Sequence, residues 1–421
     1  MKQKYLPRIA DIVLADALQA TGAVLLEGPK WCGKTRTAQE QSNSTLFMQD
    51  PDRSESYVKA ADTKPSLLLR GNMPRLLDEW QVAPVLWDAV RFAVDKDNTP
   101  GQFILTGSAT PTDDVVRHTG TGRIARMMMR PMSLFESLES NGTISLKDIF
   151  DGNDDVSSLS TLTIDDLAYA MVRGGWPASM GRKESVAVRS SYEYIDSIIN
   201  MDISKVDGIE KNPARVRALL RSLARNISTQ ATIATIRGDI EADEESISEK
   251  TISYYLNALR RIFVVEDVPA WNPAMRSKIA IRTSAKRHFV DPSIATAVSR
   301  SSTSSLLEDF ETFGLLFESL CVRDLRVYAQ SIDGEIFHYR DKSGLEADAI
   351  VHLRDGRWGA IEIKLGSKEI EMAAENLKRL KSKINTDKMK EPSFLMVLTG
   401  SEIAYKREDG VLIVPIGCLK N

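Results

Sequence analysis

Residues 23–35 read AVLLEGPKWCGKT, an apolar run that leads into the pattern G-x-x-x-x-G-K-T. The apolar run at 23–26 predicts a buried strand, and TRTAQE at 35–40 predicts a helix directly after the glycine-rich turn. Glycines let a backbone curl until successive N–H groups point inward, and the N-terminus of the helix adds a positive dipole. The stretch therefore predicts a phosphate-binding loop, and with it a nucleotide-binding protein.

Individual side chains of this loop have expected roles. Lys34 is placed to reach the β- and γ-phosphates of a nucleotide, and the Thr35 hydroxyl is placed to hold Mg²⁺. Cys32 would contribute its backbone rather than its thiol. The expected nucleotide-binding residues are Gly28, Pro29, Lys30, Trp31, Cys32, Gly33, Lys34, Thr35 and Arg36.

A pair of carboxylates follows the apolar residues of PRLLDEWQ, residues 74–81. A buried strand through Leu76 and Leu77 would deliver Asp78 and Glu79 to its C-terminal tip, beside the phosphate loop. Asp78 is expected to bind Mg²⁺, through water or Thr35, and Glu79 to orient and activate the attacking water as the catalytic base. The same letters on a helix would be a solvated end, but their place between two strand patterns favours the metal-site interpretation.

The next strand pattern, residues 102–106, ends in Gly107-Ser108-Ala109. A small polar residue at such a strand tip can touch the γ-phosphate and the attacking water. Ser108 is the first candidate for this catalytic position and Thr106 the second.

A glycine-rich stretch with two arginines, HTGTGRIARMMMRPMSLFE, runs from residue 118 to residue 136. Arg123, and after it Arg126, could present a guanidinium to the phosphate of a neighbouring subunit as an arginine finger. The other interpretation is a surface turn that leads into a strand at 127–129. An arginine finger that acts on a neighbouring subunit requires a homo-oligomer. The role of these arginines and the oligomeric state therefore stay open together.

The composition limits the class of protein. The chain has 421 residues, of which 43% are hydrophobic and 27% charged, so it is globular and large enough for two to four domains. Its net charge is −3, so any nucleic-acid surface must be a local patch. The 3 cysteines are far apart, and neither a signal peptide nor a membrane-spanning stretch is present. We therefore expect a soluble cytoplasmic protein without a membrane partner.

The composition of the sequence changes at two places in the middle of the chain. Residues 140–163 are polar and acidic and predict a connecting segment, followed by a helical region over 184–202. From residue 212, three helical segments and a strand pair around 262–271 and 278–290 predict a winged helix. Two stretches here carry only positive charge, with Lys211, Arg215, Arg217, Arg221, Arg225 and Arg237 in the first and Arg276, Lys278, Arg282, Lys286 and Arg287 in the second. They predict either a phosphate-backbone reader or a solvated helix face that contacts protein.

The C-terminal part holds a second group of charged residues. Glu318 falls in a predicted helix, Asp348 in a strand, and Glu362 and Lys364 at alternate positions of another strand, on one face of a sheet. Asp348 and Glu362 could bind a second divalent metal, Mg²⁺ or Mn²⁺, and Lys364 could position water for attack on a phosphodiester. The other interpretation is a degenerate nuclease fold that is kept as a binding module.

Taken together, the motifs GPKWCGKT, LLDEWQ, LTGS, GRI and RGGWP resemble those of the bacterial and archaeal AAA+-type P-loop ATPases whose C-terminal half is a domain of unknown function. The resemblance implies a winged helix joined to a PD-(D/E)xK, restriction-endonuclease-like module. It also implies ATP and Mg²⁺ at Gly33, Lys34, Thr35 and Asp78, with Glu79 as base, and nuclease-type positions at Glu318, Asp348, Glu362 and Lys364. The proline usual before the Asp is absent, because Ala347 stands there.

The expected architecture is α/β, in four parts. These are an AAA+-like P-loop ATPase core with a parallel sheet (1–137), a helical lid or linker (138–204), a winged-helix-like domain (205–300) and a nuclease-like α/β domain (301–421). Two functions follow as hypotheses. In the first, ATP hydrolysis drives a C-terminal half that engages DNA or RNA, and whether it also cleaves the nucleic acid is left open. In the second, the protein is a signalling or scaffold switch whose C-terminal half binds another protein and cuts nothing.

Overall fold

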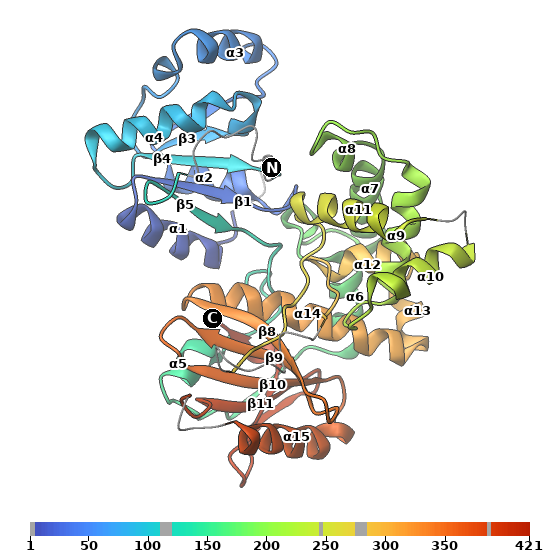
Figure 1. Cartoon of the computed structure of the whole chain (residues 1–421). Coiled ribbons are helices and arrows are strands. Elements are labelled where there is room, and N and C mark those ends of the chain that lie inside the picture. The colour runs from blue at the N-terminus through green and yellow to red at the C-terminus, as the bar shows by residue number, and fades with distance from the viewer. Residues whose placement is uncertain (1–4, 110–119, 244–246, 274–283, 385–388) are drawn as a thin grey trace. The chain divides into compact units, whose positions relative to one another are not determined.

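The computed structural model describes residues 5–109, 120–243, 247–273, 284–384 and 389–421 (Figure 1). The chain divides into two units by its internal contacts. The first comprises Met1–Pro131 with Met201–Glu210 and Asn257–Phe263, and the second comprises Met132–Asn200, Lys211–Leu256 and Val264–Asn421.

The first unit is built on a parallel sheet with the strand order β2-β3-β4-β1-β5. Its strands are β1 (Ala23–Glu27), β2 (Ser44–Phe47), β3 (Arg75–Asp78), β4 (Phe103–Gly107) and β5 (Ile124–Met128). Its helices are α1 (Ile9–Ala20), α2 (Lys34–Gln41), α3 (Ser54–Thr63) and α4 (Val85–Asp97). Because β4 lies between β1 and β3 and the strands are parallel, the C-terminal ends of these three strands lie side by side at one end of the sheet. The α/β class and the parallel sheet expected for this part are confirmed.

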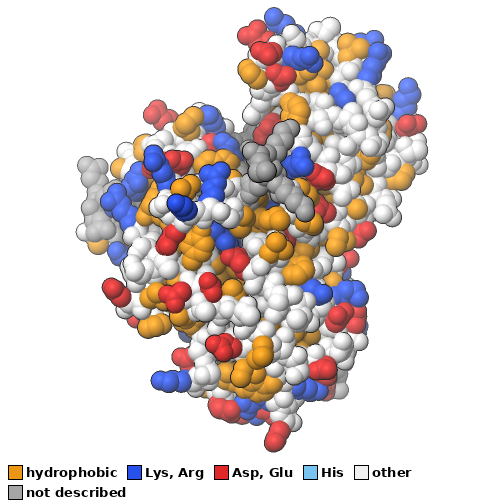
Figure 2. Space-filling model, turned by 180° about the vertical axis from the view of Figure 1, so that it is seen from behind, with side chains coloured by type: hydrophobic (Ala, Val, Ile, Leu, Met, Phe, Trp, Pro, Cys, Tyr) orange, Lys and Arg blue, Asp and Glu red, His pale blue; other side chains and the backbone are white. Residues whose placement is uncertain are grey.

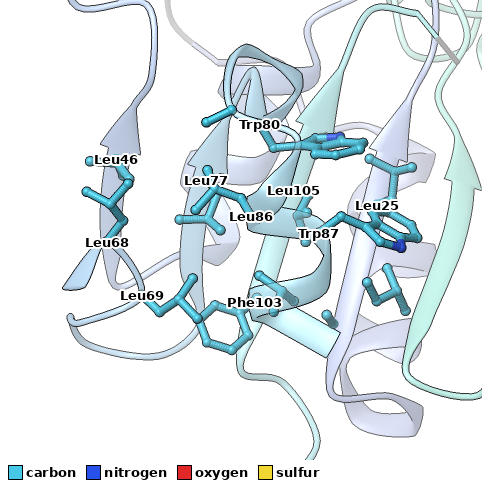
Figure 3. Close-up of a cluster of buried hydrophobic side chains, with 14 of the residues drawn as sticks. Leu25, Leu46, Leu68, Leu69, Leu77, Trp80, Leu86, Trp87, Phe103 and Leu105 are labelled. Atoms are coloured by element: carbon cyan, nitrogen blue, oxygen red, sulfur yellow. The ribbon is translucent and has the colours of Figure 1, made fainter. Parts of the chain in front are cut away.

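Both faces of this sheet are buried, which explains why its strands read as continuous apolar runs. Leu25, Leu77 and Leu105 point to the face covered by Trp87 of α4, as Figure 3 shows. Val24, Leu76 and Ile104 point to the other face, where they join Leu14 and Leu18 of α1. The period of two along each strand therefore divides one sequence run between two cores.

The second unit contains most of the helices. They are α5 (Leu146–Phe150), α6 (Ile164–Arg173), α7 (Glu184–Ser197), α9 (Pro213–Arg225), α10 (Ile233–Asp243), α12 (Pro292–Ser299), α13 (Thr303–Glu308), α14 (Phe310–Gln330) and α15 (Ile370–Lys383). The helices α8 (Ile203–Lys205) and α11 (Glu249–Arg261) belong wholly or partly to segments that group with the first unit. Helix α7 continues into a π-helical turn, Ile198–Asp202.

A mixed sheet of the order β7-β12-β13-β11-β10-β9-β8 forms the C-terminal part of this unit. Its strands are β7 (Ser158–Leu159), β8 (Gly334–Arg340), β9 (Glu346–Leu353), β10 (Trp358–Lys364), β11 (Phe394–Thr399), β12 (Ile403–Lys406) and β13 (Leu412–Pro415). Strands β6 (Ile144–Ser145) and β14 (Leu419–Lys420) form a separate parallel pair. Apolar side chains of α15, among them Leu377 and Leu380, pack with Trp358 and Val397 of the large sheet.

The expectation of a connecting segment at 140–163 needs correction. This polar stretch supplies β6, which pairs with β14, and β7, which pairs with β12, so it is tied to the C-terminal strands. The preceding residues are fixed as well, since Leu134 N donates to Asp324 Oδ2 at 2.9 Å. Strands of two residues leave too short a pattern to be recognised in a sequence. The four expected domain ranges themselves remain a prediction.

The region expected to be a winged helix contains α9, α10 and α11, followed by two antiparallel bridges, Val265 with Phe289 and Val268 with Lys286. Residues 274–283, which hold Arg276, Lys278 and Arg282 and the expected tip of the strand pair, lie outside the described residues. The winged-helix assignment therefore stays a prediction.

Candidate functional site

The glycine-rich loop joins β1 to α2 with backbone angles that require glycine. Gly28 has a φ of +152°, and a Cβ added there would lie 2.1 Å from the carbonyl oxygen of Met129. Gly33, directly before α2, has a φ of +102°, and no described side chain caps this helix end. The N–H groups of the first turn of α2 are therefore available to an anion, together with the positive end of the helix dipole.

Lys34 is buried beneath this loop. Its ammonium donates hydrogen bonds to the carbonyl oxygens of Gly28, at 2.9 Å, and Pro29, at 2.8 Å. These neutral acceptors hold the ammonium in place without cancelling its charge, so the charge remains available to a phosphate.

The carboxylate of Asp78, at the tip of β3, is held by two hydroxyl groups. Thr35 Oγ1 and Thr106 Oγ1 each donate to Asp78 Oδ1 at 2.7 Å. Thr35 lies in the first turn of α2 and Thr106 lies on β4, so the three residues join three elements of the fold. A carboxylate oxygen next to a threonine hydroxyl is a ligand pair suited to Mg²⁺.

Glu79 follows β3 in the left-handed region, with a φ of +55°. Its backbone N–H donates to Thr106 Oγ1 at 3.1 Å, while its carboxylate accepts from Gln81 Nε2 and from Ser108 Oγ, the latter at 3.4 Å. The structure thus brings Glu79 and Ser108 together, as the sequence predicts. Thr106, the second candidate, instead binds the carboxylate of Asp78 and the backbone of Glu79.

The remaining loop residues have structural contacts. Cys32 is buried, with its carbonyl oxygen accepting from Arg8 at 2.8 Å. Lys30 forms an ion pair with Asp202 at 2.6 Å. Arg36 forms an ion pair with Glu40 at 2.5 Å, while Trp31 has a φ of +68°. Asp202 is a partner of this loop that the sequence analysis does not predict, because a contact between residues 172 positions apart leaves no local pattern.

Arg123 does not lie at the phosphate loop. Its carbonyl oxygen accepts from the N–H of Ala23, the first residue of β1, whereas the loop follows the last residue of that strand. A strand of this length separates the two by about 15 Å. The guanidinium of Arg123 is half exposed and pairs with Asp95 at 2.5 Å, while that of Arg126 lies over the Trp87 ring, 5.4 Å from its centroid. His118, the first residue of the glycine-rich stretch, lies outside the described residues.

The structure brings the four expected nuclease-type residues together near Lys286, which the sequence analysis places in a basic stretch of the winged-helix region. The Lys286 ammonium lies 2.6 Å from Glu318 Oε1 and 2.9 Å from Asp348 Oδ1. The Lys364 ammonium lies 2.7 Å from Glu362 Oε2 and 3.3 Å from Asp348 Oδ2. Lys286 was expected on a basic surface; it is buried instead, because its charge faces carboxylates far away in the sequence.

Burial and charge shift the pKa values of this cluster in opposite directions. Burial raises the pKa of Glu318 to about 7, although Lys286 opposes the shift. Burial and the charge of Asp348 raise the pKa of Glu362 to about 8. Burial alone would raise the pKa of Asp348 as well, but Lys286, Lys364 and the N–H of Ile363 hold it well below its usual range. Glu318 and Glu362 therefore keep their protons to a higher pH than Asp348 does.

Several described members of the basic stretches form ion pairs with nearby acids. Arg217 pairs with Asp196 at 3.4 Å, Arg225 with Asp239 at 3.5 Å, Arg237 with Glu249 at 3.0 Å and Arg287 with Asp267 at 2.8 Å, and Lys211 is buried. Figure 2 shows Lys and Arg side chains mixed with acidic and hydrophobic ones on one face of the molecule. A phosphate-backbone reader needs unpaired positive charge, so these pairs favour the interpretation as a solvated helix face.

Three family models match the chain. One, described as an AAA domain, matches residues 20–138, and two described as domains of unknown function (DUF8612 and DUF4143) match residues 164–305 and 313–419. Together with the loop geometry, the first match defines the class: the N-terminal part of the chain is an AAA-type, P-loop ATPase-like domain. The other two leave the winged-helix and nuclease-like assignments as predictions.

Two mycobacterial proteins and one solved structure are similar to most of the chain. Uncharacterised proteins of Mycobacterium tuberculosis (Rv2008c) and Mycobacterium bovis (Mb2031c) are each 25% identical over 369 residues, which cover 85% of this chain and 73% of theirs. A solved structure, the Walker-type ATPase PabY2304 of Pyrococcus abyssi, matches 71% of this chain and 97% of its own with 14% identity and a TM-score of 0.43. In the part of the chain that the structure describes, no helix has the length and apolar character needed to cross a bilayer.

Proposed function

We propose that this protein binds ATP with Mg²⁺ at the phosphate loop and hydrolyses it. The observation that carries the proposal is the set of hydrogen bonds that Thr35 and Thr106 make to Asp78 at the tip of β3. These bonds orient a carboxylate beside the first turn of α2 without neutralising it. The choice of adenine over guanine rests on the family resemblance, because no guanine-reading N-K-x-D motif is present.

Each residue of the loop would act on the phosphates in its own way. The first-turn N–H groups of α2 and the Lys34 ammonium would bind the phosphate oxygens, with Lys34 leaving the carbonyls of Gly28 and Pro29 to do so. Thr35 and Asp78 would hold Mg²⁺. When bound, the metal supplies positive charge that stabilises the charge developing during phosphoryl transfer.

Glu79 would serve as the base for the attacking water. Its carboxylate lies at the strand tip next to Asp78 and is oriented by Gln81 and Ser108. A carboxylate held in this way can accept a proton from water while the γ-phosphoryl group is attacked. Ser108, 3.4 Å from that carboxylate, would position the same water.

Arg123 would act only on a second copy of the chain. Arg123 lies beside the first residue of β1, whereas its own phosphate loop follows the last residue of that strand. An arginine finger at this position therefore requires a homo-oligomer. Sedimentation of the protein with and without ATP tests this part of the proposal, and hydrolysis that is independent of protein concentration in a monomer would reject it.

The test of the ATPase proposal is hydrolysis of ATP, with GTP as the comparison, by the wild type and Lys34→Ala. Turnover of ATP that is lost in the variant supports the proposal. The matched control is Lys30→Ala, because Lys30 is the other loop lysine and pairs with Asp202 instead of lying beneath the loop. Equal hydrolysis by wild type and Lys34→Ala would reject the proposal.

For the C-terminal half, we propose a non-catalytic module that binds a protein partner and responds to the nucleotide state. The pairing of the basic side chains with acids supports this reading over nucleic-acid binding. Retention on immobilised DNA at increasing salt distinguishes the two, because phosphate contacts weaken steeply with salt.

Cleavage of nucleic acid is the competing function, and the gathering of Asp348, Glu362 and Lys364 on β9 and β10 favours it. Its test is hydrolysis of a plasmid and a single-stranded oligonucleotide with Mg²⁺ or Mn²⁺, with and without ATP. Cleavage by the wild type that is lost in Glu362→Ala would establish it.

A further inference from the structure

Lys286 places a positive charge between two carboxylates in the interior of the second unit. Its ammonium lies 2.6 Å from Glu318 Oε1, on α14, and 2.9 Å from Asp348 Oδ1, on β9. Both distances are those of charge-assisted hydrogen bonds, and all three residues are buried. A cation is therefore already bound where the two elements meet.

Two further carboxylate oxygens of the cluster are also paired. Asp348 Oδ2 accepts from the N–H of Ile363 at 2.9 Å and lies 3.3 Å from the Lys364 ammonium, which lies 2.7 Å from Glu362 Oε2. Three carboxylates and two ammonium groups leave little negative charge to attract a divalent metal. Among the described residues, no three Asp, Glu, His or Cys side chains are arranged to hold a metal ion.

The backbone holds Lys286 in this position. Its N–H donates to the carbonyl oxygen of Val268 at 2.9 Å, and the N–H of Val268 donates back at 2.9 Å. The neighbouring Arg287 is buried in a pair with Asp267, and His288 is fully buried. Lys286 is therefore a built-in part of the interior and not a surface side chain folded inward.

We propose that the Lys286 ammonium takes the place of a divalent metal between Glu318 and Asp348, so that the C-terminal α/β domain works without a metal. The expected nuclease site does not fit a second Mg²⁺ or Mn²⁺, since the ion would have to displace a buried, paired lysine. The cluster instead joins the segment 284–290 to α14 and β9. The inference is independent of the ATP site.

The proposal predicts that the site gains a metal ion when the ammonium is removed. Lys286→Ala would leave Glu318 and Asp348 facing a space of lysine size. Water could enter this space and complete the coordination of an ion between the two carboxylates. Carboxylate and water oxygens form a ligand set suited to Mn²⁺.

The experiment is titration of the full-length protein with Mn²⁺ alone, without nucleotide, followed by electron paramagnetic resonance. We expect at least tenfold tighter Mn²⁺ binding by Lys286→Ala than by the wild type, and loss of that gain in Lys286→Ala/Asp348→Asn. The control is Arg287→Ala, which removes the neighbouring buried cation together with its hydrogen bonds to Asp267 and to the carbonyl oxygen of Ala231. A folded Lys286→Ala protein that gains no Mn²⁺ affinity would overturn the proposal.

If Lys286→Ala does not fold, a second comparison, between the wild type and Asp348→Asn, tests the proposal. The wild type and Asp348→Asn are titrated in the same way and incubated with plasmid DNA and Mg²⁺. The proposal predicts equal Mn²⁺ binding and no cleavage by either. A Mn²⁺ site or a nuclease activity that is present in the wild type and absent in Asp348→Asn would overturn it, and failure of ATP hydrolysis would leave it standing.

Discussion

The phosphate loop and the C-terminal cluster both combine lysine with carboxylates near strands, yet the two sites satisfy these charges in opposite ways. At the loop, Lys34 is bound by backbone carbonyls and Asp78 by two hydroxyls, so each charge is positioned without being cancelled. In the cluster, Lys286 and Lys364 bind the carboxylates directly.

This difference shows that residue type alone does not define a metal site. Neutral partners orient an ion and leave its field available to a ligand, whereas an ammonium removes the charge that a divalent metal would need. The predictions below separate the two sites, in order of decreasing effect.

Glu79→Gln should have the largest effect on activity. The amide keeps the shape of the side chain but cannot accept a proton, so we expect hydrolysis to fall by about 10²–10⁴-fold while ATP still binds. Single-turnover hydrolysis and binding of a fluorescent ATP analogue measure the two properties separately. A variant that hydrolyses ATP at the wild-type rate would exclude Glu79 as the base.

Lys34→Ala should weaken both binding and turnover. Loss of one positively charged phosphate contact is expected to lower kcat by about 10²–10³-fold, by analogy with other charge-stabilising donors. Steady-state kinetics on the variant and on Lys30→Ala measure this effect, and an equal loss in both variants would contradict the special role of Lys34.

Lys286→Met should destabilise the second unit without a direct effect on ATP hydrolysis. Removing one partner of a buried ion pair leaves charge uncompensated, and we expect a loss of about 3–5 kcal/mol in the free energy of unfolding. Urea denaturation measures the loss. Lys364→Met is the control and should lose less, because its side chain is 22% exposed and its partner Glu362 can remain protonated. The reverse order would contradict the central position of Lys286.

Glu362→Gln should change how stability depends on pH. The folded pKa of Glu362, about 8, lies above the ordinary value of 4.5, so its contribution to stability is full below pH 4.5 and is lost as the pH rises to 8. Glutamine does not titrate, so the variant should gain stability relative to the wild type over this window, by at most about 1.4 kcal/mol per pH unit. Denaturation at pH 5, 6.5 and 8 measures the trend, and a difference that stays constant over this range would show that Glu362 is ionised throughout.

Thr106→Val should have the smallest effect. It removes the hydroxyl that binds Asp78 and the backbone of Glu79, and we expect a loss of about 1 kcal/mol, roughly a factor of five in kcat. Thr106→Ser keeps the hydroxyl and should retain most of the activity. Kinetics of both variants test this, and equal values for valine and serine would remove Thr106 from the site.

The sequence predicts the first unit well because its signals are local. The strand before Gly28, the helix after it and the carboxylates after Leu77 each follow from runs of neighbouring residues. The strands β6 and β7 could not be predicted, since each has two residues and depends on partners in the C-terminal strands.

The C-terminal cluster could be predicted only in part. The strand pattern predicts that Asp348, Glu362 and Lys364 lie together, and the family resemblance adds Glu318. Lys286 reads as a surface charge because it stands among other basic residues. A run of like charges does not reveal which member faces a buried carboxylate. That partner is set by the tertiary fold.

The most direct test of the comparison is the number of Mn²⁺ ions that the wild-type chain binds with and without ADP. We predict one ion in the presence of ADP, lost in Asp78→Asn, and no tight site in its absence. A nucleotide-independent ion that is retained in Asp78→Asn and lost in Asp348→Asn would contradict the account, because it would place a working metal site where Lys286 is bound.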